Sequence, residues 1–173
     1  MKRIAIDMDE VIADFHPKMV ETFNRHFALD LGNDDLNLFS LRHEKPEMLQ
    51  QIMTLVSEPD FFGDLAVIAD SQRVIEELSK KYEVFITTAA MEVPTSFNAK
   101  FSWLKAHFPA IKPSNIVFCG NKGIINADYM IDDNAINFAH FRGEGILYSA
   151  PHNLNVTGYR RVKNWLEIET LLL

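Results

Sequence analysis

Side chains able to do chemistry follow directly after several short apolar runs in this sequence. In chain order they are Asp7, Asp9, Thr88, Lys122, Asp132 and Asp133. Ligands of open parallel α/β sheets bind beyond the carboxyl ends of the strands, which meet at one edge of the sheet. If the apolar runs are parallel strands, these acids, the hydroxyl and the lysine converge on one site.

The acidic residues are the most informative part of this set. Carboxylates held close together repel one another strongly unless a cation lies between them. Oxygen ligands of this kind suit Mg²⁺, which also tends to engage substrate phosphate. We therefore take Asp7, Asp9, Asp132 and Asp133 as candidate metal ligands. The pattern does not decide which of Asp132 and Asp133 binds the metal directly.

The threonines and lysines are candidates for binding a phosphate group. Thr88 lies at a strand end, where its hydroxyl and the following backbone N–H groups reach phosphate oxygens, whereas Thr87 is expected to be an ordinary strand residue. The position of Lys122, after a strand and opposite the acids, predicts that its ammonium group binds phosphate. Lys100 lies beside the apolar stripe of a helix, where a lysine either extends to solvent or reaches the phosphate.

The apolar runs and the patterns between them predict the fold class. Continuous apolar runs rather than alternating ones favour parallel strands covered on both faces. Outside these runs, apolar residues recur at the spacing of a helix face. The three sets are Val74, Ile75 and Leu78; Phe97, Phe101, Leu104 and Phe108; and Val162, Trp165 and Leu166. The alternation predicts an α/β fold, a three-layer doubly wound parallel sheet. The predicted strands are Ile4–Asp7, Val84–Thr88, Ile116–Cys119, Tyr129–Ile131 and, more weakly, Ile146–Tyr148.

One interval breaks the alternation and predicts a helical insertion. No strand pattern is evident between about Val11 and Leu65, whereas aromatic and apolar residues recur every four positions from Phe15 to Phe27, and Pro46–Val56 is also helical. We expect a small helical cap at residues 13–65, placed directly after the first strand. Residues 1–12 and 66–173 then form the α/β core.

Composition narrows the classes of partner. The 173 residues carry a net charge of −7, which disfavours binding to long nucleic acid or to an anionic membrane. The single cysteine, Cys119, cannot form an internal disulfide, and neither a signal-type segment nor a membrane-spanning run is evident. We expect a cytoplasmic protein with a small-molecule substrate, and the sequence leaves a homodimer open.

The motifs resemble those of the haloacid dehalogenase-like phosphatases. DMDEV resembles the first signature of that superfamily, DxDx[TV], and Thr88, Lys122 and the Asp132–Asp133 pair resemble the next three in order. The resemblance implies a Mg²⁺-dependent phosphatase of Rossmann-type fold. It also implies that Asp7 attacks phosphorus to form an aspartyl-phosphate, that Asp9 serves as general acid and base, and that Lys122 completes the catalytic set.

A closer resemblance, over most of the chain, is to the 5'(3')-deoxyribonucleotidases. It is carried by DMDEVIADF, PDFFGDL, VFITTAA and NAKFSWLKAHF. It implies a nucleoside monophosphate substrate, phosphate contacts from Thr88, Ala89 and Lys100, and an apolar wall for the base. Phe15 is the main wall residue, and Phe39, Phe61 and Phe62 either join it or are ordinary packing residues.

Three positions depart from that family's pattern and leave the substrate open. Ala89 stands where a serine is frequent, Asn134 where an arginine is common, and Glu92 near the place of a base-contacting lysine. The alternative substrate is another small phosphomonoester, such as a sugar phosphate. A receiver-type phospho-acceptor domain is a second alternative, although its phosphorylated Asp follows a middle strand and it has no helical insertion.

Overall fold

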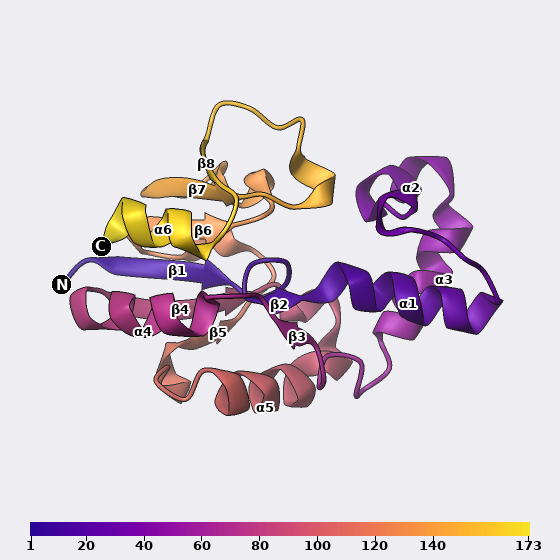
Figure 1. Ribbon diagram of the computed structural model, residues 1–173, viewed down its shortest axis with the longest axis horizontal. Helices are drawn as coiled ribbons and strands as arrows, with labels where there is room; N and C mark the ends of the chain where they lie inside the picture. The colour runs from indigo at the N-terminus through magenta and orange to yellow at the C-terminus, as the bar shows by residue number, and fades with distance from the viewer.

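The computed structural model describes residues 1–33, 35–38 and 41–173, and its main sheet lies in the left-hand part of the view in Figure 1. Within the described residues its six strands are all parallel, in the order β5-β4-β1-β6-β7-β8. These strands are β1 (Arg3–Asp7), β4 (Glu83–Thr88), β5 (Ile116–Phe118), β6 (Tyr129–Asp132), β7 (Glu144–Tyr148) and β8 (Arg160–Val162). The α/β doubly wound fold predicted from the sequence is confirmed.

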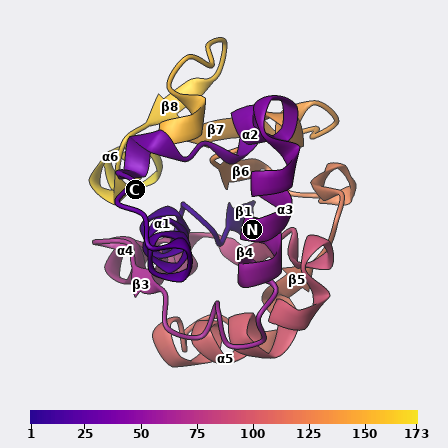
Figure 2. The same ribbon diagram turned by 90° about the vertical axis from the view of Figure 1, so that its right-hand side faces the viewer.

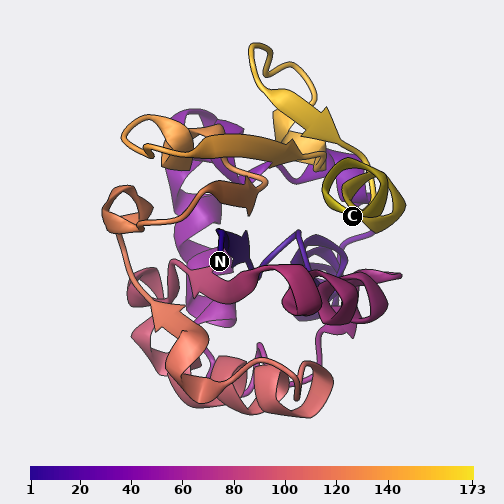
Figure 3. The ribbon, with the colours of Figure 1, turned by 90° about the vertical axis from the view of Figure 1, so that its left-hand side faces the viewer.

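The two faces of the sheet are covered differently. Side chains alternate along each strand, so that Ile4 and Ile6 of β1 face the larger core while Ala5 faces a smaller one. Helices contribute to the larger core, whereas Phe138 and nearby loop residues cover the smaller one. The helices are α4 (Ser71–Lys81), α5 (Phe97–His107) and α6 (Trp165–Leu172), and the short 3₁₀ turns η5 (Lys122–Ile124) and η6 (Ala135–Phe138) follow β5 and β6. Figure 3 shows α4 and α6 together on one side of the sheet.

Three helices stand beyond the carboxyl end of the sheet, where the insertion was predicted (Figure 1). They are α1 (Phe15–Phe27), α2 (Leu38–Glu44) and α3 (Pro46–Val56). Met19 and Phe23 of α1 are buried, as are Ile52 and Val56 of α3, and these side chains belong to the same apolar cluster as the larger core of the sheet. Figure 2, which looks onto these helices, shows them in front of the ends of β1, β4 and β6.

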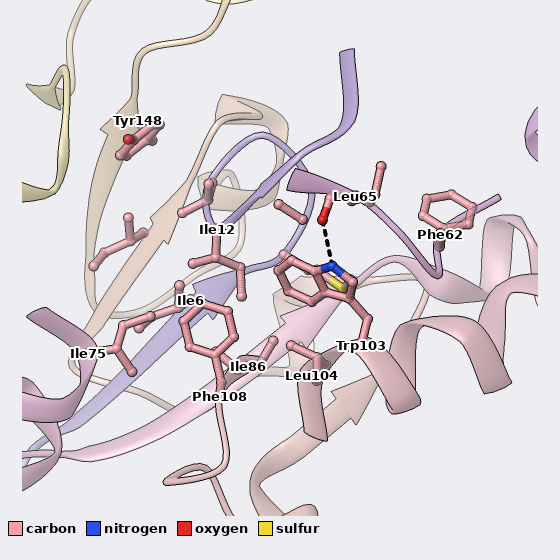
Figure 4. Packing of buried hydrophobic residues seen from close by; sticks show 14 of the residues in the cluster. Ile6, Ile12, Phe62, Leu65, Ile75, Ile86, Trp103, Leu104, Phe108 and Tyr148 are labelled. Atoms are coloured by element: carbon pink, nitrogen blue, oxygen red, sulfur yellow. Dashed lines mark hydrogen bonds between the residues drawn. The ribbon is translucent and has the colours of Figure 1, made fainter. Parts of the chain in front are cut away.

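A short antiparallel ladder joins the segment where the chain enters the insertion to the segment where it returns to the sheet. β2 (Ala13–Asp14) pairs with β3 (Ala66–Val67). The sequence pattern did not reveal it, because two residues are too few to show a strand period. Trp103 of α5 fixes the returning segment, since its indole Nε1 donates to the Leu65 carbonyl at 2.8 Å (Figure 4).

Two sequence-based assignments in the core are wrong. Val162 belongs to β8 rather than to the last helix, and Leu166 of that helix is 49% exposed while Trp165 is fully buried. Phe101 is likewise 40% exposed, because α5 buries Ala99, Lys100, Trp103 and Leu104 instead. In both helices, apolar residues at suitable spacing did not identify the buried face.

The exchange of Trp165 for Phe tests this packing. The Trp165 indole donates to the Val11 carbonyl at 2.8 Å in the loop that follows β1. Trp165→Phe leaves that buried carbonyl unpaired and creates a small cavity, so we expect a loss of about 2–3 kcal/mol in the free energy of unfolding. Leu166→Ala is the matched control and should cost less than about 0.5 kcal/mol in the same urea titration. Equal losses for the two variants would contradict the assigned burial.

Candidate active site

Three buried carboxylates meet where β1 and β6 end side by side. Asp7 is the last residue of β1, Asp132 is the last of β6, and Asp133 follows it. Each offers one oxygen within 4.8 Å of the others. Burial, followed by the charge of Asp132 and Asp9, raises the pKa of Asp7 to about 6 although Lys122 opposes the shift. Burial and the neighbouring acids also raise the pKa of Asp133 well above its ordinary value.

The ammonium group of Lys122 forms ion pairs with both Asp7 and Asp132. Its Nζ lies 2.5 Å from Asp7 Oδ1 and 2.7 Å from Asp132 Oδ2, and the side chain is 1% exposed. Burial alone would lower the pKa of Lys122, but the two carboxylates outweigh that effect and hold the pKa above its usual range. Lys122 is therefore charged, and it offsets only part of the negative charge of the site.

Asp132 and Asp133 differ in how far the protein already satisfies them. Asp132 Oδ1 accepts from the Asn134 N–H at 2.9 Å, both Asp132 oxygens accept from Asn137 Nδ2 at 3.0 Å, and Oδ2 also accepts from Lys122. Asp133 Oδ2 lies 3.2 Å from the imidazole Nε2 of His152. Asp133 thus retains more capacity to bind a cation than Asp132 does.

Asp9, Thr88 and Lys100 form a second cluster beside the acids. Lys100 Nζ pairs with Asp9 Oδ2 and donates to Thr88 Oγ1 at 3.1 Å. Its ammonium lies 4.3 Å from the centre of the Phe62 ring. Asp9 Oδ1 is buried without a hydrogen-bond partner in the described structure. Lys100 therefore turns inward, and Thr87 is a buried strand residue with its hydroxyl directed to the Ile6 carbonyl.

A cavity of about 300 Å³ opens between these clusters and the helices α1–α3. Its polar lining includes Asp7, Asp9, Lys100, Lys122 and Asp133. Its apolar wall includes Phe15 and Phe62, whose rings stack with centres 5.8 Å apart and planes at 15°. Ala89 also lines the cavity, whereas Phe61 packs edge-on against Phe15. The predicted contact Phe39 lies outside the described residues.

Three residues of this region were missed by the sequence interpretation. Glu10 and His152 line the cavity, and Asn137 both lines it and holds Asp132. His152 follows β7, so its position after a strand end is the signal that could have identified it. Burial raises the pKa of Glu10 to about 7 and lowers that of His152.

The donor set fits a divalent cation. Three buried carboxylates with a single neighbouring lysine leave excess negative charge. Burial, and after it the neighbouring acids, raises the pKa values of Asp7 and Asp133. Carboxylate oxygens with room for water and phosphate are the ligands that Mg²⁺ takes in phosphoryl-transfer sites.

The helices in the described part of the chain are too short or too polar for any of them to span a membrane.

The fold is shared with haloacid dehalogenase-like hydrolases. A HAD family hydrolase from Deinococcus radiodurans with bound phosphate and sodium matches with a TM-score of 0.65 at 12% identity, covering 99% of this chain and 95% of that one. A HAD hydrolase from Bacillus subtilis bound to magnesium matches with a TM-score of 0.60 at 12% identity, covering 99% and 98%.

Sequence comparison gives the family. The family described as 5' nucleotidase, deoxy (pyrimidine), cytosolic type C matches residues 1–173. A protein from Bacillus subtilis (strain 168) named 5'(3')-deoxyribonucleotidase is 44% identical over 172 residues, which cover 99% of each chain. The chain belongs to this nucleotidase family and is a phosphoric monoester hydrolase. The receiver-domain alternative is thereby excluded.

Proposed function

We propose that the protein is a Mg²⁺-dependent 5'(3')-deoxyribonucleotidase of the cytoplasm that hydrolyses nucleoside monophosphates through an aspartyl-phosphate. The observation that carries this proposal is one cavity that is lined both by carboxylates and lysines and by the stacked rings of Phe15 and Phe62. The polar side suits a phosphate with its metal, and the aromatic wall suits a base. The name of the relative supports the same substrate class.

The metal ligands in this proposal are Asp7, Asp133 and the backbone carbonyl of Asp9, with Asp132 acting through water. When bound, Mg²⁺ supplies positive charge that keeps Asp7 ionised and offsets charge on the phosphoryl oxygens. Asp132 is assigned the indirect role because its oxygens already accept hydrogen bonds from Lys122, Asn137 and the Asn134 N–H.

The chemical steps use the side chains of Asp7 and Asp9. An Asp7 oxygen forms a bond to phosphorus while the bond from phosphorus to the ribose oxygen breaks, and Asp9 gives that oxygen its proton. A water molecule then attacks phosphorus, Asp9 takes its proton, and the bond to Asp7 breaks to release phosphate. Lys100 pairs with Oδ2 of Asp9, the side chain that transfers the proton in both steps.

Thr88, Lys100 and Lys122 bind the phosphate in this mechanism, together with the backbone after Thr88 at Ala89. One buried ammonium group, that of Lys122, lies beside Asp7, and the other, that of Lys100, lies beside Asp9. Their charge stabilises the transition state, in which negative charge spreads over the phosphoryl oxygens. Residues 13–65 act as a cap over a core of residues 1–12 and 66–173, and the cap supplies the wall that receives the nucleoside.

A panel of phosphate esters, assayed with and without Mg²⁺, tests the substrate and the metal together. We expect kcat/KM for thymidylate and uridylate to exceed that for sugar phosphates by at least about tenfold, because only a base fills the aromatic wall. A chelator should abolish turnover and added Mg²⁺ should restore it. Comparable rates for nucleotides and sugar phosphates would refute the nucleotide assignment, and full activity in chelator would refute the metal.

A further inference from the structure

Glu10 occupies a strained position in the loop between Asp9 and helix α1. Its φ of 63° lies in the left-handed region, which residues other than glycine seldom adopt without strain. The Glu10 N–H donates to the Ala13 carbonyl at 2.8 Å, which fixes this turn. A glycine would satisfy the same backbone at lower cost, so the Glu10 side chain must contribute something that offsets the strain.

The carboxylate of Glu10 provides the N-terminal cap that helix α1 otherwise lacks. Asp14, at the N-cap position of α1, makes no side-chain capping bond, and the first turn of the helix has no acidic residue. Glu10 Oε1 instead accepts from the His16 N–H at 2.6 Å. A side-chain oxygen that accepts from the free N–H groups at the start of a helix stabilises the helix terminus.

This contact spans two parts of the site that the sequence separates by only a few residues. Glu10 follows Asp9 directly, and Phe15 is the first residue of α1 and part of the aromatic wall. The hydrogen bond from the His16 N–H to Glu10 therefore connects the segment that carries Asp9 to the aromatic wall through one side chain. The side chain is half-buried close to Asp9 and Asp14, an unfavourable setting for another acid unless it makes such a contact.

We propose that Glu10 is a positioning residue that holds the start of α1, and with it Phe15, at a fixed place relative to Asp9. This inference rests on the proposed function, because it concerns where the nucleoside leaving group lies relative to its proton donor. Glu10 itself acts through α1 and Asp9 rather than on the phosphate.

The test compares two substrates in Glu10→Gly, Glu10→Gln and the control Glu21→Gln, which removes an exposed carboxylate from the same helix. In Glu10→Gly we expect kcat/KM for thymidylate to fall about tenfold, the equivalent of one lost helix cap, while methyl phosphate, which has no ring to place against the wall, changes less than about twofold. Glu10→Gln keeps an acceptor oxygen and should recover most of the loss. Glu21→Gln should match the parent protein on both substrates.

Hydrogen exchange of the His16 amide gives a readout independent of substrate. We expect this amide to exchange faster in Glu10→Gly than in the parent protein and to be largely protected again in Glu10→Gln. Unchanged exchange, unchanged thymidylate turnover in Glu10→Gly, or equal losses on both substrates would overturn the proposal. If the parent protein hydrolyses no nucleotide, the nucleotidase function fails, and the exchange rates alone decide whether Glu10 holds α1.

Discussion

Asp7→Asn should lower kcat for thymidylate by at least about 10⁴-fold, since the loss of a nucleophile in a covalent mechanism removes nearly all turnover. The amide occupies the same volume at the end of β1 but cannot form the acyl phosphate. The measurement is the rate of phosphate release under saturating substrate, with Mg²⁺ present. Binding of the nucleotide should persist, because Thr88, Lys100 and the Phe15 wall remain.

The control for this substitution is Asp30→Asn, on the exposed segment after α1, which should leave turnover unchanged. Circular dichroism of both variants checks that the fold is intact. A residual rate in Asp7→Asn within about tenfold of the parent protein would remove Asp7 as nucleophile. The reaction would then have to proceed by direct attack of water on phosphorus.

Lys122→Met has the second large expected effect, because the ammonium lies between Asp7 and Asp132 with 1% exposure. Methionine has a similar length and leaves the buried acids without their protein cation. We expect kcat to fall by about 10²–10³-fold. We also expect the free energy of unfolding, measured in chelator, to fall by about 3–5 kcal/mol, the cost of breaking a buried ion pair.

Magnesium separates the two contributions of Lys122. If the cation binds among Asp7, Asp132 and Asp133, added Mg²⁺ should recover part of the stability lost in Lys122→Met but little of its activity. Lys112→Met, an exposed position before β5, is the matched control and should change neither quantity. A stability loss below about 1 kcal/mol would contradict the role of Lys122 as the counter-ion of the buried acids.

The part of the site that follows from strand ends could be predicted from the sequence. Buried parallel strands appear as continuous apolar runs, and the residue after each run is directed to a common edge, so Asp7, Thr88, Lys122, Asp132 and Asp133 could be placed together from sequence alone. Lys100 was ambiguous, because a lysine beside an apolar stripe can turn either way. Its contact with Asp9 depends on the distance between α5 and β1, which spacing does not encode.

The remaining features depend on contacts that no local pattern carries. Val162 and Trp165 are close enough in sequence to suggest one helix, yet Val162 pairs with Tyr148 of β7 and so belongs to a strand. The capping of α1 by Glu10, and the bonds from Asn137 to Asp132, are made by polar side chains whose partners are set by turns. The identity of the polar residues at the strand ends does not predict these contacts, in which one side chain holds another residue in place.

The most direct test of the proposed chemistry is a crystal structure with Mg²⁺ and beryllium fluoride, which mimics a phosphoryl group bound to a carboxylate. We predict beryllium bonded to an oxygen of Asp7 and one cation held by Asp7 and Asp133, with Lys122 still paired to Asp7. Beryllium fluoride bound away from Asp7, or no cation among the three buried carboxylates, would contradict the proposed mechanism.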